Sequence, residues 1–252
     1  MTDQYLLRLA TDLAERAAAA ILAIRSKGFD VVSKSDESPV TAADHAAEAL
    51  IVAGLRQATP AIPVIAEEEV AAGRVTAPSG EYWLVDPLDG TREFAAGRDE
   101  FTVNVGLVRD GRAVIGAVAV PALGELFGGI VGHGAFKRGP TGEHPIHTRT
   151  APDDGLTVMC SRHYAADPKL AAFLEGRPVA SVTNIGSAVK FLRVAEGAAD
   201  LYPRLGRTME WDTAAPQAVL EAAGGHVRLF DGTSLAYGKP DWANPPFICT
   251  GK

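Results

Sequence analysis

Cysteine is scarce in this chain of 252 residues, which contains only Cys160 and Cys249, far apart in the sequence. The two lack metal-ligand spacing, so we interpret them as buried, reduced thiols of a cytosolic protein. Long apolar runs are also missing from the sequence, which excludes a helix that crosses a bilayer. No Gly-x-Gly-x-x-Gly motif follows the first expected strand, and this disfavours a dinucleotide-dependent oxidoreductase.

Positive charge is in deficit, with a formal net charge of -7. This disfavours a nucleic-acid polymer as a partner, because binding its backbone needs a positive field. A small anionic substrate would need a local cation to attract it. The apolar run at residues 17–24 is short and flanked by arginines, so we assign it to an amphipathic helix and not to a signal peptide. We expect a cytoplasmic monomer or homodimer without a transmembrane segment, and peripheral association with the inner membrane face is left open.

Apolar periodicity predicts regular structure over most of the chain. Helices are expected up to about Gly28 and, capped by Thr41, to about Ala58. The first half should then form strands at 62–66, 82–85, 101–109, 113–120, 125–131 and 134–137. In the second half, strands at 156–160, 179–184 and 201–203 alternate with helices at 167–175, 187–197 and 213–223. The change of pattern predicts an α+β lobe over residues 1–147 and an α/β lobe over 148–252, with a site between them.

Two aspartates follow an apolar strand in the segment Val85-Asp86-Pro87-Leu88-Asp89-Gly90. The proline fixes a turn, and the glycine permits a backbone shape that other residues resist. Two carboxylates three residues apart in a tight turn repel each other at neutral pH, and a divalent cation between them removes that cost. Oxygen ligands without histidine or cysteine suit a hard ion such as magnesium.

Other acids also follow apolar strands or begin helices. Glu67 to Glu69 follow a strand, and Asp212 precedes a helix in which Pro216 is expected in the first turn. Each feature alone has an ordinary interpretation, as a solvated turn, an exposed acidic run or a helix N-cap. Their occurrence in one chain favours a shared cation site. Thr91, before a short helix, adds backbone amides that suit a phosphate.

Three of these segments resemble the motifs of the lithium-sensitive, magnesium-dependent phosphatase superfamily that includes inositol monophosphatase and fructose bisphosphatase. They are Glu67-Glu68, Asp86-Pro-Leu-Asp-Gly-Thr91 and Trp211-Asp-Thr-Ala-Ala215, in the family's order and approximate spacing. The resemblance covers nearly the whole chain. It implies a layered α-β-α-β-α sandwich of mixed α+β and α/β character, and magnesium-dependent hydrolysis of a small phosphorylated metabolite.

Further segments resemble the 3'(2'),5'-bisphosphate nucleotidases of sulfate assimilation. They are Arg92–Phe94, Glu100–Asn104, Gly186–Phe191, Ala195–Gly197 and Leu201–Arg204. This branch hydrolyses adenosine 3',5'-bisphosphate to AMP and phosphate. Two alternatives are left open: an inositol or histidinol monophosphatase of the same superfamily, and a non-catalytic protein that binds a metal or a nucleotide. One departure is Pro216, where many members have glycine.

The resemblance also implies roles for individual residues. Glu67, Asp86 and the carbonyl of Leu88 would hold one magnesium ion, and Asp86, Asp89 and Asp212 a second, with a third, weaker ion near Glu67 left open. Thr91 with Asp44 would orient and deprotonate the attacking water, and Glu67 is counted with these catalytic residues.

The substrate would meet residues from both lobes. Lys190 and Arg204 are candidates for a second phosphate, with a snorkelling lysine and a structural ion pair as the alternatives. Lys34 and its polar loop resemble the loop that closes near the metals in the family. The full predicted substrate-binding set is Glu67, Leu88, Asp89, Gly90, Thr91, Gly186, Ser187, Lys190, Arg204 and Asp212.

Overall fold

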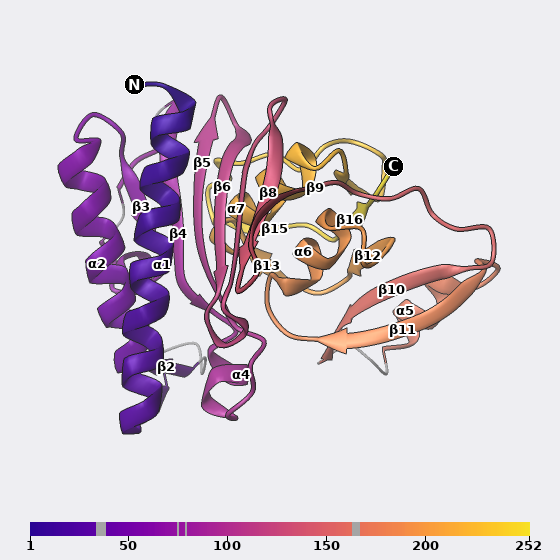
Figure 1. Cartoon of the computed structure of the whole chain (residues 1–252), viewed down its shortest axis with the longest axis horizontal. Helices are drawn as coiled ribbons and strands as arrows, with labels where there is room; N and C mark the ends of the chain where they lie inside the picture. Colours follow the sequence, from indigo (N-terminus) through magenta and orange to yellow (C-terminus); the bar gives the residue numbers. More distant parts are fainter. Residues whose placement is uncertain (34–38, 75, 79, 163–166) are drawn as a thin grey trace.

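The computed structural model describes residues 1–33, 39–74, 76–78, 80–162 and 167–252. Figure 1 shows helices α1 and α2 on one side of a large sheet, with α7 and α6 between that sheet and a second one. Helix α5 packs on the outer face of the second sheet through Leu170 and Phe173. These five layers confirm the α-β-α-β-α sandwich expected from the sequence.

Helices α1 (Asp3–Lys27) and α2 (Ala42–Ala58) form the first layer, as predicted. Thr41 caps α2 in a capping box, because its hydroxyl accepts from the amide of Ala43 while Asp44 accepts from the amide of Thr41. Their apolar stripes, including Leu13, Ile21 and Ile51, are buried against the sheet. Among the described residues, no helix has the length and apolar character that crossing a membrane requires.

The first sheet has seven strands in the order β3-β4-β5-β6-β7-β8-β9; β3 runs parallel to β4 and the remaining neighbours are antiparallel. A hairpin turn lies between Arg109 and Arg112, where Asp110 and Gly111 both have positive φ. Strand β9 was not predicted, because its polar residues resembled a seam between lobes. The strands are β3 (Val64–Ala66), β4 (Glu81–Asp89), β5 (Thr102–Arg109), β6 (Arg112–Val120), β7 (Glu125–Ile130), β8 (Gly134–Gly139) and β9 (Gly142–Ile146).

Strand β4 runs further than predicted, since it passes through Asp86 and Pro87 and ends at Asp89. A register shift between Asp86 and Asp89 absorbs the proline, which has no amide to donate to the ladder. Asp86 lies opposite Asn104 and Leu84 lies opposite Gly106, so these four share one face of the sheet. That face is the one covered by α7.

The second sheet has five strands in the order β11-β10-β12-β16-β14. Its strands are β10 (Leu156–Ser161), β11 (Val179–Ile185), β12 (Leu201–Arg204), β14 (His226–Leu229) and β16 (Phe247–Thr250), and it carries α5 (Pro168–Leu174) and α6 (Val189–Ala195) on opposite faces. Each large sheet takes its strands from its own side of residue 147, and the division into lobes there stays a prediction. The remaining elements are β1 (Val31–Ser33), β2 (Pro39–Thr41), α3 (Glu67–Ala71), α4 (Thr91–Ala95), η1 (Pro121–Leu123), β13 (Thr208–Met209) and β15 (Ala243–Asn244).

Helix α7 (Glu210–Ala222) begins three residues earlier than predicted. Asp212 is therefore the third helical residue and not the N-cap, and Met209 takes the cap position. Pro216 lies in the second turn, beyond the predicted first turn, and it removes the amide that would bond the carbonyl of Asp212.

A row of glycines lies beneath α7. Gly106, Gly116 and Gly129 face one another across β5, β6 and β7. A Cβ atom at Gly106 would come within 2.7 Å of the amide nitrogen of Ala215, and one at Gly116 would overlap the carbonyl oxygen of Ala215. Backbone thus packs directly on backbone, which explains why the helix has small residues at Ala214 and Ala215. This close approach fixes the height of α7, and with it Asp212, above the sheet.

We expect Gly116→Ala to lower the free energy of unfolding by about 3 kcal/mol, because the methyl group must push α7 away from β6. Chemical denaturation measures the change. Gly139→Ala is the matched control in the same sheet, since a Cβ there meets no heavy atom within 4 Å, and it should change stability by less than about 1 kcal/mol. Equal effects of the two substitutions would contradict the proposed packing.

Candidate active site

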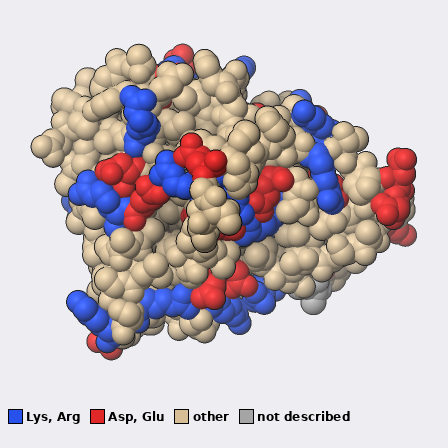
Figure 2. Space-filling view, viewed as in Figure 1, with Lys and Arg blue, Asp and Glu red and all other residues tan. Residues whose placement is uncertain are grey.

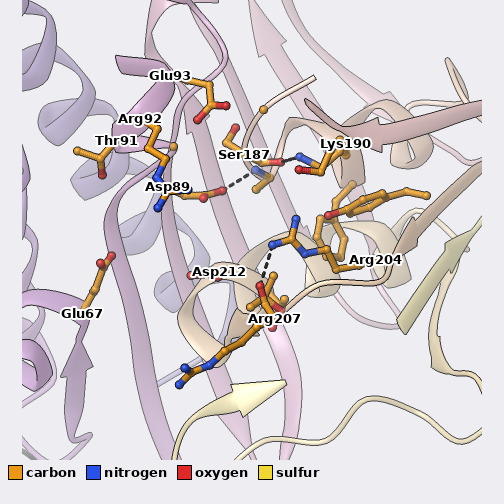
Figure 3. A pocket seen from close by; sticks show the side chains of 18 residues that line it. Glu67, Asp89, Thr91, Arg92, Glu93, Ser187, Lys190, Arg204, Arg207 and Asp212 are labelled. Carbon is orange, nitrogen blue, oxygen red and sulfur yellow. Dashed lines mark hydrogen bonds between the residues drawn. The ribbon is translucent and has the colours of Figure 1, made fainter. Parts of the chain in front are cut away.

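A cavity of about 370 Å³ is lined by residues from both halves of the chain. Figure 3 shows acidic and basic side chains projecting into it from the first sheet, from α7 and from the loops around α6. Asp44, Asp86 and Leu88 lie behind its wall, each 1% exposed. The predicted site residues that line the cavity are Glu67, Asp89, Gly90, Thr91, Gly186, Ser187, Lys190, Arg204 and Asp212.

Asp86 is one of the most deeply buried acids of the site. Burial raises the pKa of its carboxyl group well above the usual range, and the negative charges of Glu67, Asp89 and Asp212 raise it further. The carboxyl group of Glu67 is also within hydrogen-bonding reach of Asp86. One oxygen of Asp86 accepts the amide of Leu88 at 3.0 Å, which holds the turn. Acids from distant parts of the chain thus lie close enough to Asp86 to raise its pKa.

Asp89 and Asp212 are fixed by backbone amides. Asp89 Oδ2 accepts the amide of Ala188 at 2.6 Å, which ties the end of β4 to the start of α6. Asp212 Oδ2 accepts the amide of Met209 at 2.8 Å, at the start of α7. Burial, then the charge of Asp89, raises the pKa of Asp212 to about 8, while burial is also the largest cause of the raised pKa of Asp89. With a pKa of about 8, Asp212 keeps its proton at neutral pH when no cation is bound.

The chemistry of this donor set fits a hard divalent cation. The donors are carboxylate oxygens and the carbonyl of Leu88, and a cation would replace the protons that repulsion keeps on the acids. Asn104, opposite Asp86, is fully buried, and neither polar atom of its amide finds a partner among the described residues. The side chains do not yet form a closed cage: within the described ranges, no group of three His, Cys, Asp or Glu side chains is arranged to hold an ion. The two ligand sets therefore stay predictions.

Asp44 and Thr91 meet although they are 47 residues apart. The hydroxyl of Thr91 donates to Asp44 Oδ1 at 3.1 Å and lies 3.1 Å from the carbonyl oxygen of Leu88. Asp44 Oδ2 accepts from the amide and the hydroxyl of Thr41, both at 2.7 Å. These donors hold the carboxylate of Asp44 in place at the start of α2.

Two turns bring backbone close to the cavity. Gly90 has φ of 93° and precedes α4, and a Cβ atom there would lie 3.1 Å from the carbonyl oxygen of Glu100 and 3.2 Å from Ser187 Cβ. Ser187 has φ of 47°, in the left-handed region that few non-glycine residues adopt. The two turns face each other, so the predicted substrate-binding residues Gly90 and Ser187 come together.

Lys190 is bound to the protein itself. Its Nζ atom donates to the carbonyl oxygens of Ile185 at 3.1 Å and Ser187 at 2.6 Å, and it lies 5.3 Å from the centre of the Tyr202 ring. The lysine is 2% exposed, and burial lowers its pKa to about 8. Two of its three donors hold the strained turn at Ser187. Arg204 similarly donates to the carbonyl oxygen of Arg207 at 2.8 Å.

Sequence reasoning missed several residues of the cavity wall. Arg92 and Arg207 line it, and within the described part of the chain neither guanidinium has a protein partner. Arg92 belonged to a recognised segment, but nothing local marked Arg207. Glu48 was also missed: it lies one turn after Asp44 on α2, and burial followed by the charges of Glu68 and its neighbours raises its pKa to about 7. Lys34 lies outside the described residues.

Charges of both signs are interspersed on the face shown in Figure 2, where Lys and Arg alternate with Asp and Glu across the middle of the molecule. Among the ion pairs of the described residues, Lys137 and Arg193 both pair with Glu125 and Glu196. This face does not present one continuous basic surface. The absence of a nucleic-acid partner stays a prediction.

Comparisons with known proteins agree on the family. The inositol monophosphatase family model matches residues 2–250. The 3'(2'),5'-bisphosphate nucleotidase CysQ of Escherichia coli (strain K12) is 43% identical over 238 residues, 93% of this chain and 95% of that protein. The 3'-phosphoadenosine 5'-phosphate phosphatase of Mycobacterium leprae is 37% identical over 254 residues, 95% and 87% of the two chains. The crystal structure of CysQ from Bacteroides thetaiotaomicron, 35% identical, covers 99% of this chain and 98% of its own with a TM-score of 0.82. The resemblance drawn from the motifs is confirmed, and this chain belongs to the inositol monophosphatase family.

Proposed function

We propose that this protein is a magnesium-dependent phosphomonoesterase that hydrolyses adenosine 3',5'-bisphosphate to AMP and phosphate. The observation that carries the proposal is one cavity lined by both acids and cations. Its acids include Glu67, Asp89 and Asp212, and its cations include Arg92 and Arg207. The relatives in E. coli and M. leprae bear names that specify this class of substrate. The cytoplasmic location and the oligomeric state stay predictions.

The acids at the cavity would hold the metal of this metal-dependent family. Glu67, Asp86 and the carbonyl of Leu88 would bind one magnesium ion, and Asp86, Asp89 and Asp212 a second; a third, weaker ion near Glu67 is left open. When bound, such ions make water a nucleophile near neutral pH and neutralise charge on the phosphate. The raised pKa of Asp86 supports this assignment, because only a cation allows all these acids to be charged together.

Thr91 and Asp44 would manage the proton of the attacking water. Because the hydroxyl of Thr91 donates to Asp44, its oxygen lone pairs are free to accept from a water molecule in the cavity. A proton leaving the water would pass to Thr91 while the hydroxyl proton of Thr91 passes to Asp44. The amides of Gly90 and Thr91, at the start of α4, would hold the scissile phosphate for in-line attack.

The cations that line the cavity would select a substrate with two phosphates. Arg92 and Arg207 have guanidinium groups without a protein partner in the described part of the chain, whereas Lys190 and Arg204 already donate to carbonyl oxygens. We therefore assign direct contact with the second phosphate first to Arg92 and Arg207. Lys190 and Arg204 would hold the neighbouring backbone in place through its carbonyl oxygens, and Lys190 keeps one further donor for the substrate.

Phosphate release with magnesium should be most efficient for adenosine 3',5'-bisphosphate when it is compared with inositol monophosphate, histidinol phosphate and fructose bisphosphate. The reason is the additional cations facing the cavity. Steady-state kcat/KM for each substrate is the measurement. A clear preference for inositol phosphate would refute the substrate assignment and leave the phosphatase assignment standing.

Arg207→Met should raise KM for the nucleotide about tenfold and change kcat/KM for inositol monophosphate less than twofold, because only the nucleotide carries the second phosphate.

Asp86→Asn should reduce phosphate release in magnesium by more than about 100-fold, since changes outside the ligand shell alone cost 10–100-fold. The metal-free variant should unfold at the same temperature as the unaltered protein or higher, because a buried acid among like charges has been removed. Assays at saturating magnesium and thermal unfolding in a chelator measure both. Asp12→Asn, at an exposed acid of α1, is the control. Near-normal turnover in Asp86→Asn would remove Asp86 from the mechanism.

The stability of the metal-free protein should fall as pH rises from about 4 to about 8. The folded protein keeps a proton on Asp212 up to a pKa of about 8, whereas the unfolded chain loses it near the ordinary value of 3.8. Magnesium requires the ionised acids, so it should raise the unfolding temperature more at about pH 8 than at about pH 6. Thermal unfolding with chelator and with magnesium at each pH tests this. An equal magnesium effect at both would show that the ion displaces no proton.

A further inference from the structure

Helix α2 carries a second buried acid that the mechanism does not use. Glu48 is 5% exposed and lies four residues after Asp44, so both acids project from the same face of the helix. Asp44 reaches Thr91, which begins α4, whereas Glu48 reaches α3. One rigid helix thus contacts the segments on both sides of the cavity.

The contact of Glu48 is with the backbone. Its Oε2 atom accepts the amide of Glu68 at 2.7 Å. This amide is the second of α3, and the cap residue Ala66 offers no side-chain acceptor. The amides of a first helical turn lack partners within the helix, so Glu48 supplies from another element the acceptor that the local sequence lacks.

The position of Glu67 follows from this contact. Glu67 is the first residue of α3, and its peptide bond to Glu68 contains the amide held by Glu48. With that peptide plane fixed, the Glu67 side chain leaves the backbone in one direction, into the cavity. A second link, the bidentate ion pair between Arg56 of α2 and Glu69, is exposed on the arginine side and does not involve the peptide bond of Glu67.

We infer that Glu48 is a positioning residue for the divalent-cation site, because its carboxylate oxygen holds the amide of Glu68 and thereby directs Glu67 at the ion. The inference rests on the proposed function, which takes Glu67 as a metal ligand. It assigns to Glu48 the role of hydrogen-bond acceptor at a set distance, so reach matters and charge does not. Groups that support metal ligands in this way set metal affinity by 10–100-fold.

Two substitutions separate reach from charge. Glu48→Gln keeps an oxygen acceptor at the same distance and removes the charge. Glu48→Asp keeps the charge but draws the oxygen back by about 1.5 Å, the length of one carbon–carbon bond, beyond hydrogen-bonding distance of the amide. Arg56→Met is the matched control, since it breaks the other contact between α2 and α3.

Binding of Mn²⁺ to the metal-free protein, followed by electron paramagnetic resonance, gives a readout that needs no catalysis. We expect Glu48→Asp to weaken Mn²⁺ binding about 10–100-fold. Glu48→Gln and Arg56→Met should stay within about threefold of the unaltered protein, because the acceptor or the main contact remains. In phosphate-release assays, Glu48→Asp should raise the magnesium concentration for half-maximal rate, while KM for the nucleotide at saturating magnesium stays within about twofold. Thermal unfolding confirms that each variant is folded.

Unchanged Mn²⁺ affinity in Glu48→Asp overturns the inference, as does an equal loss in folded Glu48→Gln. If Glu48→Asp does not fold, Glu48→Gln decides alone: retained affinity supports the acceptor role and lost affinity rejects it. A protein that binds Mn²⁺ in this pattern but releases no phosphate from adenosine 3',5'-bisphosphate would refute the proposed function and leave the role of Glu48 intact.

Discussion

Repulsion between buried acids is the constraint on which the rest of this structure depends. Asp86 is 1% exposed, and burial followed by the charges of Glu67, Asp89 and Asp212 raises its pKa. A protein gains nothing in stability from gathering such groups, because each loses hydration and meets like charge. The arrangement makes physical sense as a ligand set for a hard cation, whose charge would offset both costs.

Rigid secondary structure holds these acids against that repulsion. Backbone packing on Gly106 and Gly116 fixes α7, so Asp212 stays at a fixed distance from the sheet. The amide of Ala188 holds Asp89 and thereby joins β4 to the start of α6. Helix α2 controls the remaining side through Asp44 and Glu48. Elements from both ends of the chain are needed to build one site.

The cations that line the cavity differ in whether they bind the protein itself or are open to a ligand. Lys190 stood out in the sequence as a cation for a second phosphate, yet its ammonium group stabilises the turn at Ser187 through two carbonyl oxygens. A buried ammonium needs such acceptors to keep its proton. Arg92 and Arg207 have planar guanidinium groups that remain open to the cavity. Selection between substrates would then depend on the arginines and on the geometry that the lysine maintains.

The sequence alone determined the family, the layered fold and most of the acids, because apolar periodicity and short turn motifs are local properties. It placed Asp86 and Asp89 next to a buried strand and Thr91 before a short helix, but it ended β4 too early, at Val85, and started α7 too late. The error at β4 arose because a sheet can absorb a proline by a register shift, which depends on neighbouring strands.

Only the tertiary structure decided which groups meet. Asp89 accepts the amide of Ala188, and Glu48 accepts the amide of Glu68, although each pair is far apart in the chain. Arg207 likewise lines the cavity from a segment distant from the acids of the first sheet. No local pattern encodes such contacts, because they follow from how helices pack on the sheet. Distances and burial set by that packing determine whether a side chain binds a ligand or another part of the protein.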